Sequence, residues 1–248
     1  LGDVWTSGLA FDGARDIMDN WIVAGLLAVT SITTTMGAYG TMVEDKAEKI
    51  NKDFIASALK QSSIVGGYIL SAYVIGFIMS ILALILGEIY VIANGGTAIP
   101  FITLLEVIGI MLLSTLAGSS LILFLVSFFS SNNAFATASA IIGTIIGFLT
   151  GIYLPIGQLP DGMQWVVKLF PVSHSAVLLR QKLMAAPIAK HLANAPPEVI
   201  DELSAELGMT FHFGDYILPE YASYLILAGT ALLFFGLSVL VLSRKKNK

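Results

Sequence analysis

The chain contains no cysteine, and few of its residues are charged. Without cysteine it forms no disulfide, no thiolate metal site and no cysteine nucleophile. Charged residues make up 12% of the sequence, and no stripe of Lys and Arg interleaved with aromatic residues is present. Such a stripe is typical of nucleic-acid-binding surfaces, so we expect no nucleic-acid partner.

Motifs for enzymatic chemistry are absent as well. No G-x-x-x-x-G-K-[ST] loop occurs, so the chain does not bind and split ATP by that mechanism. His174 lies between Ser173 and Ser175, but neighbours along one helix do not place a base within reach of a nucleophile. No G-x-S-x-G motif, H-E-x-x-H motif or paired metal-ligand spacing accompanies it. We therefore expect no catalytic residue, no metal and no cofactor bound by this chain.

What the chain does contain is apolar sequence in long blocks. It is 56% hydrophobic, with a mean hydropathy of +0.84. Crossing about 30 Å of hydrocarbon takes a helix of about 20 residues. Five blocks are long enough: residues 21–43, 64–93, 100–129, 134–154 and 221–242. The sequence therefore predicts an all-α polytopic membrane protein, with one transmembrane domain over residues 1–248.

Basic residues indicate the orientation of these spans. The short segment 44–61 and the C-terminal tail hold eight of them: Lys46, Lys49, Lys52, Lys60, Arg244, Lys245, Lys246 and Lys248. Short basic segments stay in the cytoplasm, which places 44–61, 130–133 and the C-terminus there. The acidic residues 1–20 then lie outside. We expect one more span before Leu1, giving six spans with both ends inside.

Segment 44–61 is charged but keeps an apolar stripe. Ala47, Ile50, Phe54 and Ala58 recur at spacings of three and four, a pattern that predicts a short amphipathic helix. Two interpretations remain open from periodicity. The helix rests on lipid headgroups with its lysines near anionic lipid, or it docks on a cytoplasmic partner.

The fourth block is followed by a segment rich in proline and glycine that nevertheless stays apolar, residues 155–171. Lipid does not tolerate unpaired backbone groups, so this segment predicts a short helix at or dipping into the membrane edge. Two more helices are expected beyond it. One is capped by Ser173 and runs to about Ala186, and the other runs from the Pro196–Pro197 pair to Gly208. The second is either a lid or a solvated cap.

The stretches Leu154-Pro-Ile-Gly-Gln-Leu-Pro and Leu169-Phe-Pro-Val-Ser-His-Ser-Ala-Val-Leu-Leu-Arg180 carry a family resemblance. Together with the order of the spans, they resemble the permease subunit of type-2 ABC exporters over nearly the whole chain. Two departures are the missing first span and a longer 186–218 insertion.

The resemblance implies a dimer of permeases, formed by two copies or by a close paralogue. It also implies two copies of a separate ATP-binding subunit, which would hold ATP and Mg. Segment 44–61 would be the coupling helix, through residues Ile50, Phe54, Ile55, Ala58 and Leu59. Segment 155–219 would be an external re-entrant and lid segment, with gate candidates Pro155, Leu159, Pro160, Phe170 and Pro171.

The expected location is the plasma (inner) membrane of a bacterium or archaeon, in contact with membrane lipid. Because the spans have apolar walls and few charges, we expect an amphipathic or lipid-like cargo moved out of the cell. A drug, a toxin, a polyketide or a lipid-linked glycan would fit.

Small and hydroxyl residues within two spans are candidates for the pathway or for helix packing. Gly143, Gly147 and Gly151 recur every four residues, which on a helix allows close approach of a second helix. The first block carries many hydroxyls, Thr34 among them. Hydroxyls within a span usually bond back to their own helix, so most of these are expected to be silent.

Glu88 and Glu106 lie inside apolar blocks, at similar distances from the turn that joins those blocks. A carboxyl within a span is costly and is a functional candidate, unless it reaches the hydrated headgroup zone. These two acids support an alternative function, an ion-coupled secondary transporter. A non-transporting scaffold or immunity-type protein is a further alternative.

Overall fold

A computed structural model describes residues 13–50, 61–214 and 216–246. Five helices of this part are long and apolar enough to cross a membrane, as predicted. They are α2 (Ala14–Ala47), α4 (Gln61–Ala93), α5 (Phe101–Val126), α6 (Asn132–Leu149) and α11 (Glu220–Lys246). Shorter elements connect α6 to α11: η1 (Ile156–Gln158), α7 (Asp161–Leu169), α8 (Pro171–Leu183), α9 (Ala185–His191), α10 (Pro197–Glu206), β1 (His212–Phe213) and β2 (Tyr216–Ile217). The two strands pair antiparallel, with His212 opposite Ile217.

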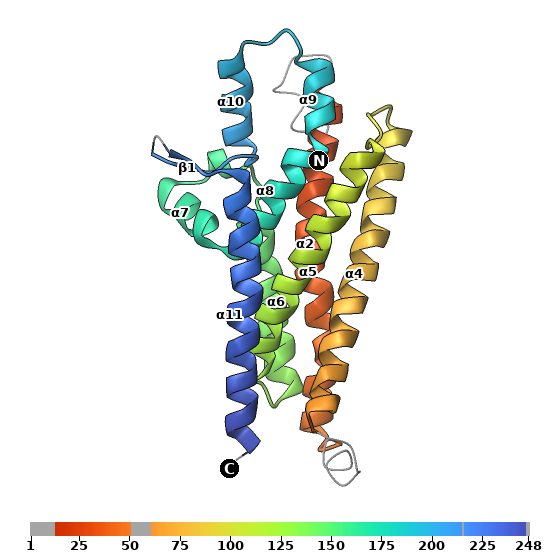
Figure 1. The fold of residues 1–248 in the computed structure, drawn as a ribbon, viewed down its shortest axis with the longest axis vertical. Coiled ribbons are helices and arrows are strands. Elements are labelled where there is room, and N and C mark those ends of the chain that lie inside the picture. The colour runs from red at the N-terminus through yellow and green to blue at the C-terminus, as the bar shows by residue number, and fades with distance from the viewer. Residues whose placement is uncertain (1–12, 51–60, 215, 247–248) are drawn as a thin grey trace.

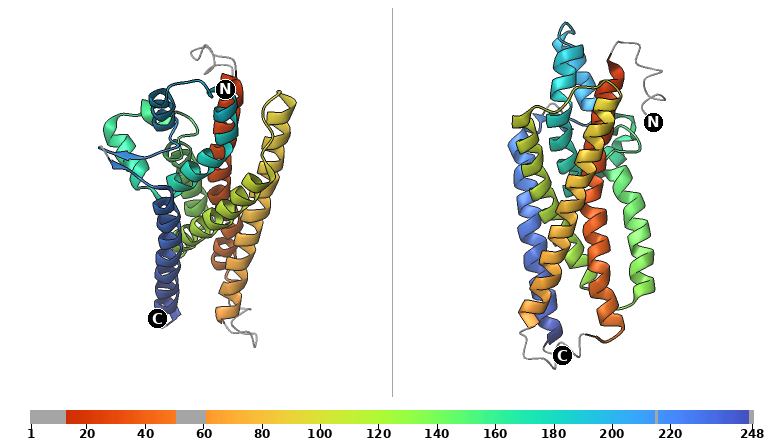
Figure 2. Two further views of the ribbon diagram at one scale, coloured as in Figure 1. Left: turned by 45° about the horizontal axis from the view of Figure 1, so that its top comes forward. Right: turned by 90° about the vertical axis from the view of Figure 1, so that its right-hand side faces the viewer.

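The long helices run along the long axis of the molecule (Figure 1). The end of α2, the start of α4, the α5–α6 turn and the C-terminal end of α11 lie at one end of the bundle, and α9 and α10 extend from the other. Figure 2 shows the same separation from two further sides. The predicted grouping of 44–61, 130–133 and the C-terminus at one end agrees with this arrangement.

Helices α2 and α5 form the centre of the bundle. In the most apolar 18-residue stretch of each helix, 56% of the residues of α2 and 61% of those of α5 are buried. The corresponding shares are 22% in α4 and α11 and 17% in α6. The outer helices present large apolar side chains outward, such as Leu86 and Leu232, which are 67% and 77% exposed. Such surfaces suit lipid, which needs no polar contact from a helix whose backbone hydrogen bonds are internal.

The fourth span is shorter than predicted. Helix α6 ends at Leu149, because Gly151 adopts a left-handed conformation with φ 69°. The Ile152 N–H donates to Gly147 O at 3.1 Å and the Gly151 N–H donates to Phe148 O at 3.0 Å, which is a Schellman motif. The predicted boundary at Leu154 was therefore five residues too late, and a glycine rather than Pro155 ends the helix.

Two more helix boundaries differ from expectation. Residues 44–47 form the last turn of α2 and do not begin a separate helix. The expected 173–186 helix is two helices, α8 and α9, and its first residue is Pro171 with Phe170 as N-cap. Ser173 does not cap α8: its hydroxyl donates to Leu149 O at 2.6 Å and so satisfies a carbonyl at the end of α6. The expected helix from Pro197 is confirmed as α10.

Candidate functional site

Helix α2 leaves one stripe outside the bundle, and much of that stripe is small or carries hydroxyls. Leu26, Gly37 and Thr41 are exposed along it, with Thr30 and Thr33 partly buried between them. Every Ser and Thr hydroxyl of α2 between residues 30 and 41 donates to a carbonyl of the same helix. The expected bonding of these hydroxyls to their own helix is therefore observed, including the 2.6 Å bond from Thr34 Oγ1 to Thr30 O, and a role of Thr34 in the pathway stays a prediction.

Helix α6 packs on α2 and is otherwise little covered. Ile141 and Ile145 are 55% and 48% exposed, and a Cβ at Gly143 would have open space around it. The three predicted glycines do not form one packing face. Gly147 lies against the ring of Tyr153, and Gly151 lies beyond the helix end, where it caps α6. The expectation that glycines spaced four residues apart share one helix face was wrong, because α6 ends at Leu149, two residues before Gly151.

A buried arginine lies where the fourth span breaks. Arg180 of α8 is fully buried, and its Nη2 donates to Thr150 O, just past the end of α6, at 2.9 Å. The guanidinium carbon is 5.0 Å from the centre of the Trp21 ring on α2. Three glycines make room for it: a Cβ at Gly25, Gly151 or Gly208 would lie 3.1–3.4 Å from a guanidinium nitrogen. Arg180 thus joins α2, α6, α8 and the end of α10.

No carboxylate pairs with this arginine among the described residues. Burial lowers the pKa of Arg180 to about 9, which still leaves it charged at neutral pH. The charge is stabilised by the Trp21 ring face and by the carbonyl end of α6, where the helix dipole favours a cation. Nε and Nη1 have no hydrogen-bond partner within the described part of the chain.

The predicted gate residues lie around η1 and α7. Pro155 and Pro160 directly precede η1 and α7, and Phe170 and Pro171 form the joint between α7 and α8. Leu159 and Phe170 pack on the same buried cluster, which is Leu149, Ile156, Val167, Val177 and Phe211. The structure brings these gate candidates to one region, and their role as a gate stays a prediction.

Glu88 and Glu106 do not share a partner. Glu88 accepts the Ile99 N–H at 3.2 Å, which holds the α4–α5 turn. Glu106 Oε2 lies 3.4 Å from Lys182 Nζ, which also lies 3.0 Å from Glu220 Oε1 and so forms two ion pairs. Burial lowers the pKa of Lys182, but the two carboxylates outweigh burial and raise it overall. Lys182 and Glu220 could not be recognised from the sequence as neighbours of Glu106, because they lie far from it along the chain.

A second cluster, which the sequence did not reveal, joins three segments at the end of the bundle where α2 begins. Asp16 at the start of α2 accepts the Thr97 N–H at 2.9 Å, the Thr97 hydroxyl at 2.6 Å and His191 Nε2 at 3.0 Å. One carboxylate therefore joins α2, the α4–α5 turn and α9. Lys190 Nζ also donates to the Thr97 hydroxyl oxygen, at 3.2 Å.

His174 is buried, and both of its ring nitrogens have hydrogen-bond partners within the protein. Its Nδ1 lies 3.1 Å from the Ser223 hydroxyl, and its Nε2 lies 3.0 Å from Lys168 O. An Nε2–H that donates to the Lys168 carbonyl leaves Nδ1 to accept from Ser223. Burial lowers the pKa of His174, although the bond to Lys168 opposes this. In residues 13–50, 61–214 and 216–246 no group of three His, Asp or Glu side chains is placed to hold a metal.

Of the predicted coupling residues, the structure describes only Ile50, in the turn that follows α2. Phe54, Ile55, Ala58 and Leu59 lie outside the described residues. Their role stays a prediction from the sequence.

Comparison with known proteins agrees with this architecture. A family model described as ABC-2 family transporter protein matches residues 10–240. The chain is also 25% identical over 178 residues to nodulation protein J of Rhizobium leguminosarum bv. viciae. That match covers 68% of the chain and 64% of the relative, so it spans just under two thirds of the relative's length.

Proposed function

Because the chain belongs to the ABC-2 family of transporter proteins, we propose that it is the permease of an ATP-driven exporter of amphipathic or lipid-like substrates. Membership makes it a multi-pass transmembrane subunit of an ABC transporter, which is not itself catalytic and works with an ATP-binding partner subunit. Export, ATP hydrolysis on two copies of that partner, and the substrate class are the proposal. The match over residues 10–240 is the observation that carries it.

Helix α2 provides a route for coupling. It is a 34-residue helix, so about 50 Å of unbroken helix joins the end that carries segment 44–61 to the Asp16 and Trp21 contacts at the other end. Because an α-helix is stiff, a displacement at segment 44–61 moves these contacts as well. We infer that the ATP-binding subunits act on Ile50, Phe54 and their neighbours, and that α2 transmits the movement to the broken segment.

The exposed face shared by α2 and α6 is the proposed meeting surface with the second permease. Its hydroxyls are satisfied within their own helices, so the surface offers methyl groups and oxygen lone pairs but little charge. Such a wall suits a molecule that is apolar along much of its length, for example a drug, a toxin, a polyketide or a lipid-linked glycan. The cargo would leave past η1 and α7, where Leu159 and Phe170 pack on the same buried cluster.

The proposed setting is the plasma (inner) membrane of a bacterium or archaeon, with segment 44–61 and the C-terminus in the cytoplasm. The second permease is a copy of this chain or a close paralogue. The family match favours this proposal over the ion-coupled alternative, in which Glu88 and Glu106 would act together; in the structure the two acids have different partners.

A pull-down from detergent-solubilised membranes tests the proposal. The wild-type protein should bring down an ATP-hydrolysing subunit, and Phe54→Glu should lose it, because a charge on the apolar stripe opposes docking. Ala56→Glu is the matched control: it adds the same charge to the same segment on the opposite helical face, and it should keep the partner.

An ATPase assay on the eluted material reads the result. Loss of ATPase activity with Phe54→Glu alone supports a docking helix. If wild type recovers no ATPase, ATP-driven export is wrong for this chain. If both glutamate variants lose it equally, the assignment of the apolar stripe is wrong.

A further inference from the structure

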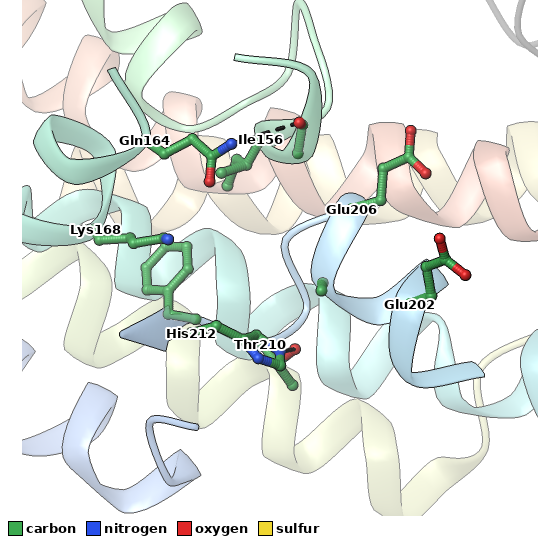
Figure 3. Close-up of a pocket in the computed structure, with 10 residues that line it drawn as sticks. Ile156, Gln164, Lys168, Glu202, Glu206, Thr210 and His212 are labelled. Atoms are coloured by element: carbon green, nitrogen blue, oxygen red, sulfur yellow. Dashed lines mark hydrogen bonds between the residues drawn. The ribbon is translucent and has the colours of Figure 1, made fainter. Parts of the chain in front are cut away.

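A polar pocket lies between η1, α7, α10 and residues 210–212, at the end of the bundle that the proposed orientation makes external (Figure 3). Its volume is about 280 Å³. The polar side chains that line it come from three segments: Gln164 and Lys168, Glu202 and Glu206, and Thr210 and His212. Pockets for drug-sized ligands start at about 300 Å³, so this one suits a small group or one end of a larger molecule.

The charges in the pocket are divided between its walls. Figure 3 shows Lys168 of α7 on one side and Glu202 and Glu206 of α10 on the other. Lys168 forms no ion pair with the described residues, and its Nζ lies 5.9 Å from the centre of the Phe213 ring. Glu206 accepts a 3.3 Å hydrogen bond from Gln158, and no hydrogen bond or ion pair of Glu202 is found within the described residues. Opposite charges therefore face one cavity without neutralising each other.

Helix α7 also carries an apolar surface beside the pocket. Met163, Trp165, Val166 and Leu169 are 43–69% exposed on this nine-residue helix, next to the start of α11 (Figures 1 and 2). Exposed Trp and other large apolar residues at the end of a membrane span lie at the headgroup level of a bilayer. Because Gln164 and Lys168 belong to the same helix, the pocket lies at the height of the outer headgroups.

We propose that this pocket binds a zwitterionic group made of a phosphate and a primary ammonium, the headgroup chemistry of phosphatidylethanolamine. The phosphate binds Lys168 and the Thr210 hydroxyl. The ammonium binds Glu202 and Glu206 on the opposite wall. The ligand thus supplies an anion for Lys168 and a cation for Glu202 and Glu206, which lie on opposite walls of the pocket.

Other headgroups fit less well. An anionic headgroup such as phosphatidylglycerol places no cation against the two glutamates. A choline headgroup carries a cation that donates no hydrogen bond to a carboxylate. Hydrogen bonds to charged groups are among the strongest in proteins, so the primary ammonium should decide the selectivity. The proposal does not depend on the direction of transport or on ATP coupling.

Isothermal titration calorimetry on the full-length protein in detergent micelles tests this proposal. The probes are dihexanoyl phosphatidylethanolamine, dihexanoyl phosphatidylcholine, dihexanoyl phosphatidylglycerol and soluble O-phosphoethanolamine. The ethanolamine lipid should bind more tightly than the other two lipids. Lys168→Gln and Glu202→Gln should each weaken its binding about tenfold, which is the loss of one charge-assisted hydrogen bond.

Glu198→Gln is the matched control, because Glu198 lies on the same helix α10 but does not line the pocket. It should leave binding unchanged, and unfolding midpoints should show that all three variants are folded. Tight binding of the lipid alone identifies a membrane lipid as the ligand. Equal binding of O-phosphoethanolamine, whose phosphate is a monoester and carries more negative charge than the lipid's, identifies a soluble compound of phosphate and primary ammonium as the ligand. Equal binding of all three lipids, or unchanged binding in both pocket variants, overturns the proposal.

Discussion

The contact between Trp21 and Arg180 should contribute about 2 kcal/mol to stability, which a double-mutant cycle can measure. Arg180 is fully buried, Trp21 is 1% exposed, and the guanidinium lies 5.0 Å from the ring centre. A desolvated cation–π contact of this geometry is worth about 2 kcal/mol. The cycle consists of wild type, Trp21→Leu, Arg180→Met and the double variant.

The single Arg180→Met change should alter stability by only about 1–2 kcal/mol, although it removes a buried charge. Lowering the pKa from the ordinary value of 12.5 to about 9 corresponds to a burial cost of about 5 kcal/mol. Three interactions stabilise the buried charge by about 2 kcal/mol or less each: the Trp21 contact, the charged hydrogen bond to Thr150 O and the dipole at the end of α6. The burial cost and these stabilising contributions nearly cancel, and a methionine, which is shorter than arginine but similar in volume, fills most of the space.

Equilibrium unfolding of the purified protein, followed by circular dichroism in mixed detergent, gives the four free energies. The hydrogen bond from Trp21 Nε1 to Leu207 O, 2.8 Å long, is lost in both backgrounds and cancels. A control cycle pairs Arg180→Met with Trp165→Leu, because the Trp165 ring packs on Phe213 of β1. It should show no coupling. Additivity within about 0.5 kcal/mol in the Trp21 cycle would refute the reasoning.

Five further outcomes are expected. Gly151→Ala should destabilise the protein by more than about 1 kcal/mol, because the residue has φ 69° and its Cβ would meet Ile156 Cγ1 at 2.9 Å. Gly143→Ala, in open space on α6, should be neutral or stabilising by up to about 1 kcal/mol, as thermal midpoints will show. Ser173→Ala should cost about 1–3 kcal/mol in the same assay, because Leu149 O loses its buried donor.

Because burial lowers the pKa of His174, the unfolded chain binds a proton that the native protein excludes, so stability should fall as the pH drops below about 6.5. His174→Gln should reduce this fall between pH 7 and pH 5.5, and an unchanged slope would contradict the assignment. Glu88→Gln should keep ATP-dependent flux in reconstituted vesicles, since a glutamine side-chain oxygen can still accept the Ile99 N–H of the α4–α5 turn; abolished flux would return Glu88 to the transport mechanism.

The number and order of the spans could be predicted because they depend on one quantity, the length of apolar sequence. A block of at least about 20 apolar residues crosses a bilayer whatever its neighbours are. The end of α6 was harder to predict, because the apolar sequence continues through Tyr153 and Leu154 after the helix has ended. The signal was present in Gly151, which caps the helix, but its spacing from Gly143 and Gly147 favoured a packing interpretation instead.

The contacts that define the candidate site could not be predicted, because each joins residues far apart in the chain. Asp16 and His191 are 175 positions apart, and Trp21 and Leu207 are 186 apart. Amphipathic patterns report which face of a helix is buried but not which residue lies opposite. Arg180 shows this limit clearly, since an arginine after an apolar stretch reads as a residue at the surface.

The position of Arg180 also explains why the fourth span stops where it does. A helix that ends inside a membrane protein leaves carbonyl groups without partners, at a cost that lipid does not reduce. Two side chains of α8 supply donors at this point: Ser173 to Leu149 O and Arg180 to Thr150 O. The end of α6 and helix α8 therefore stabilise each other. A movement of α2 that displaces Trp21 from Arg180 removes one of the three interactions that stabilise that charge, so coupling along α2 and opening at the break would share one contact.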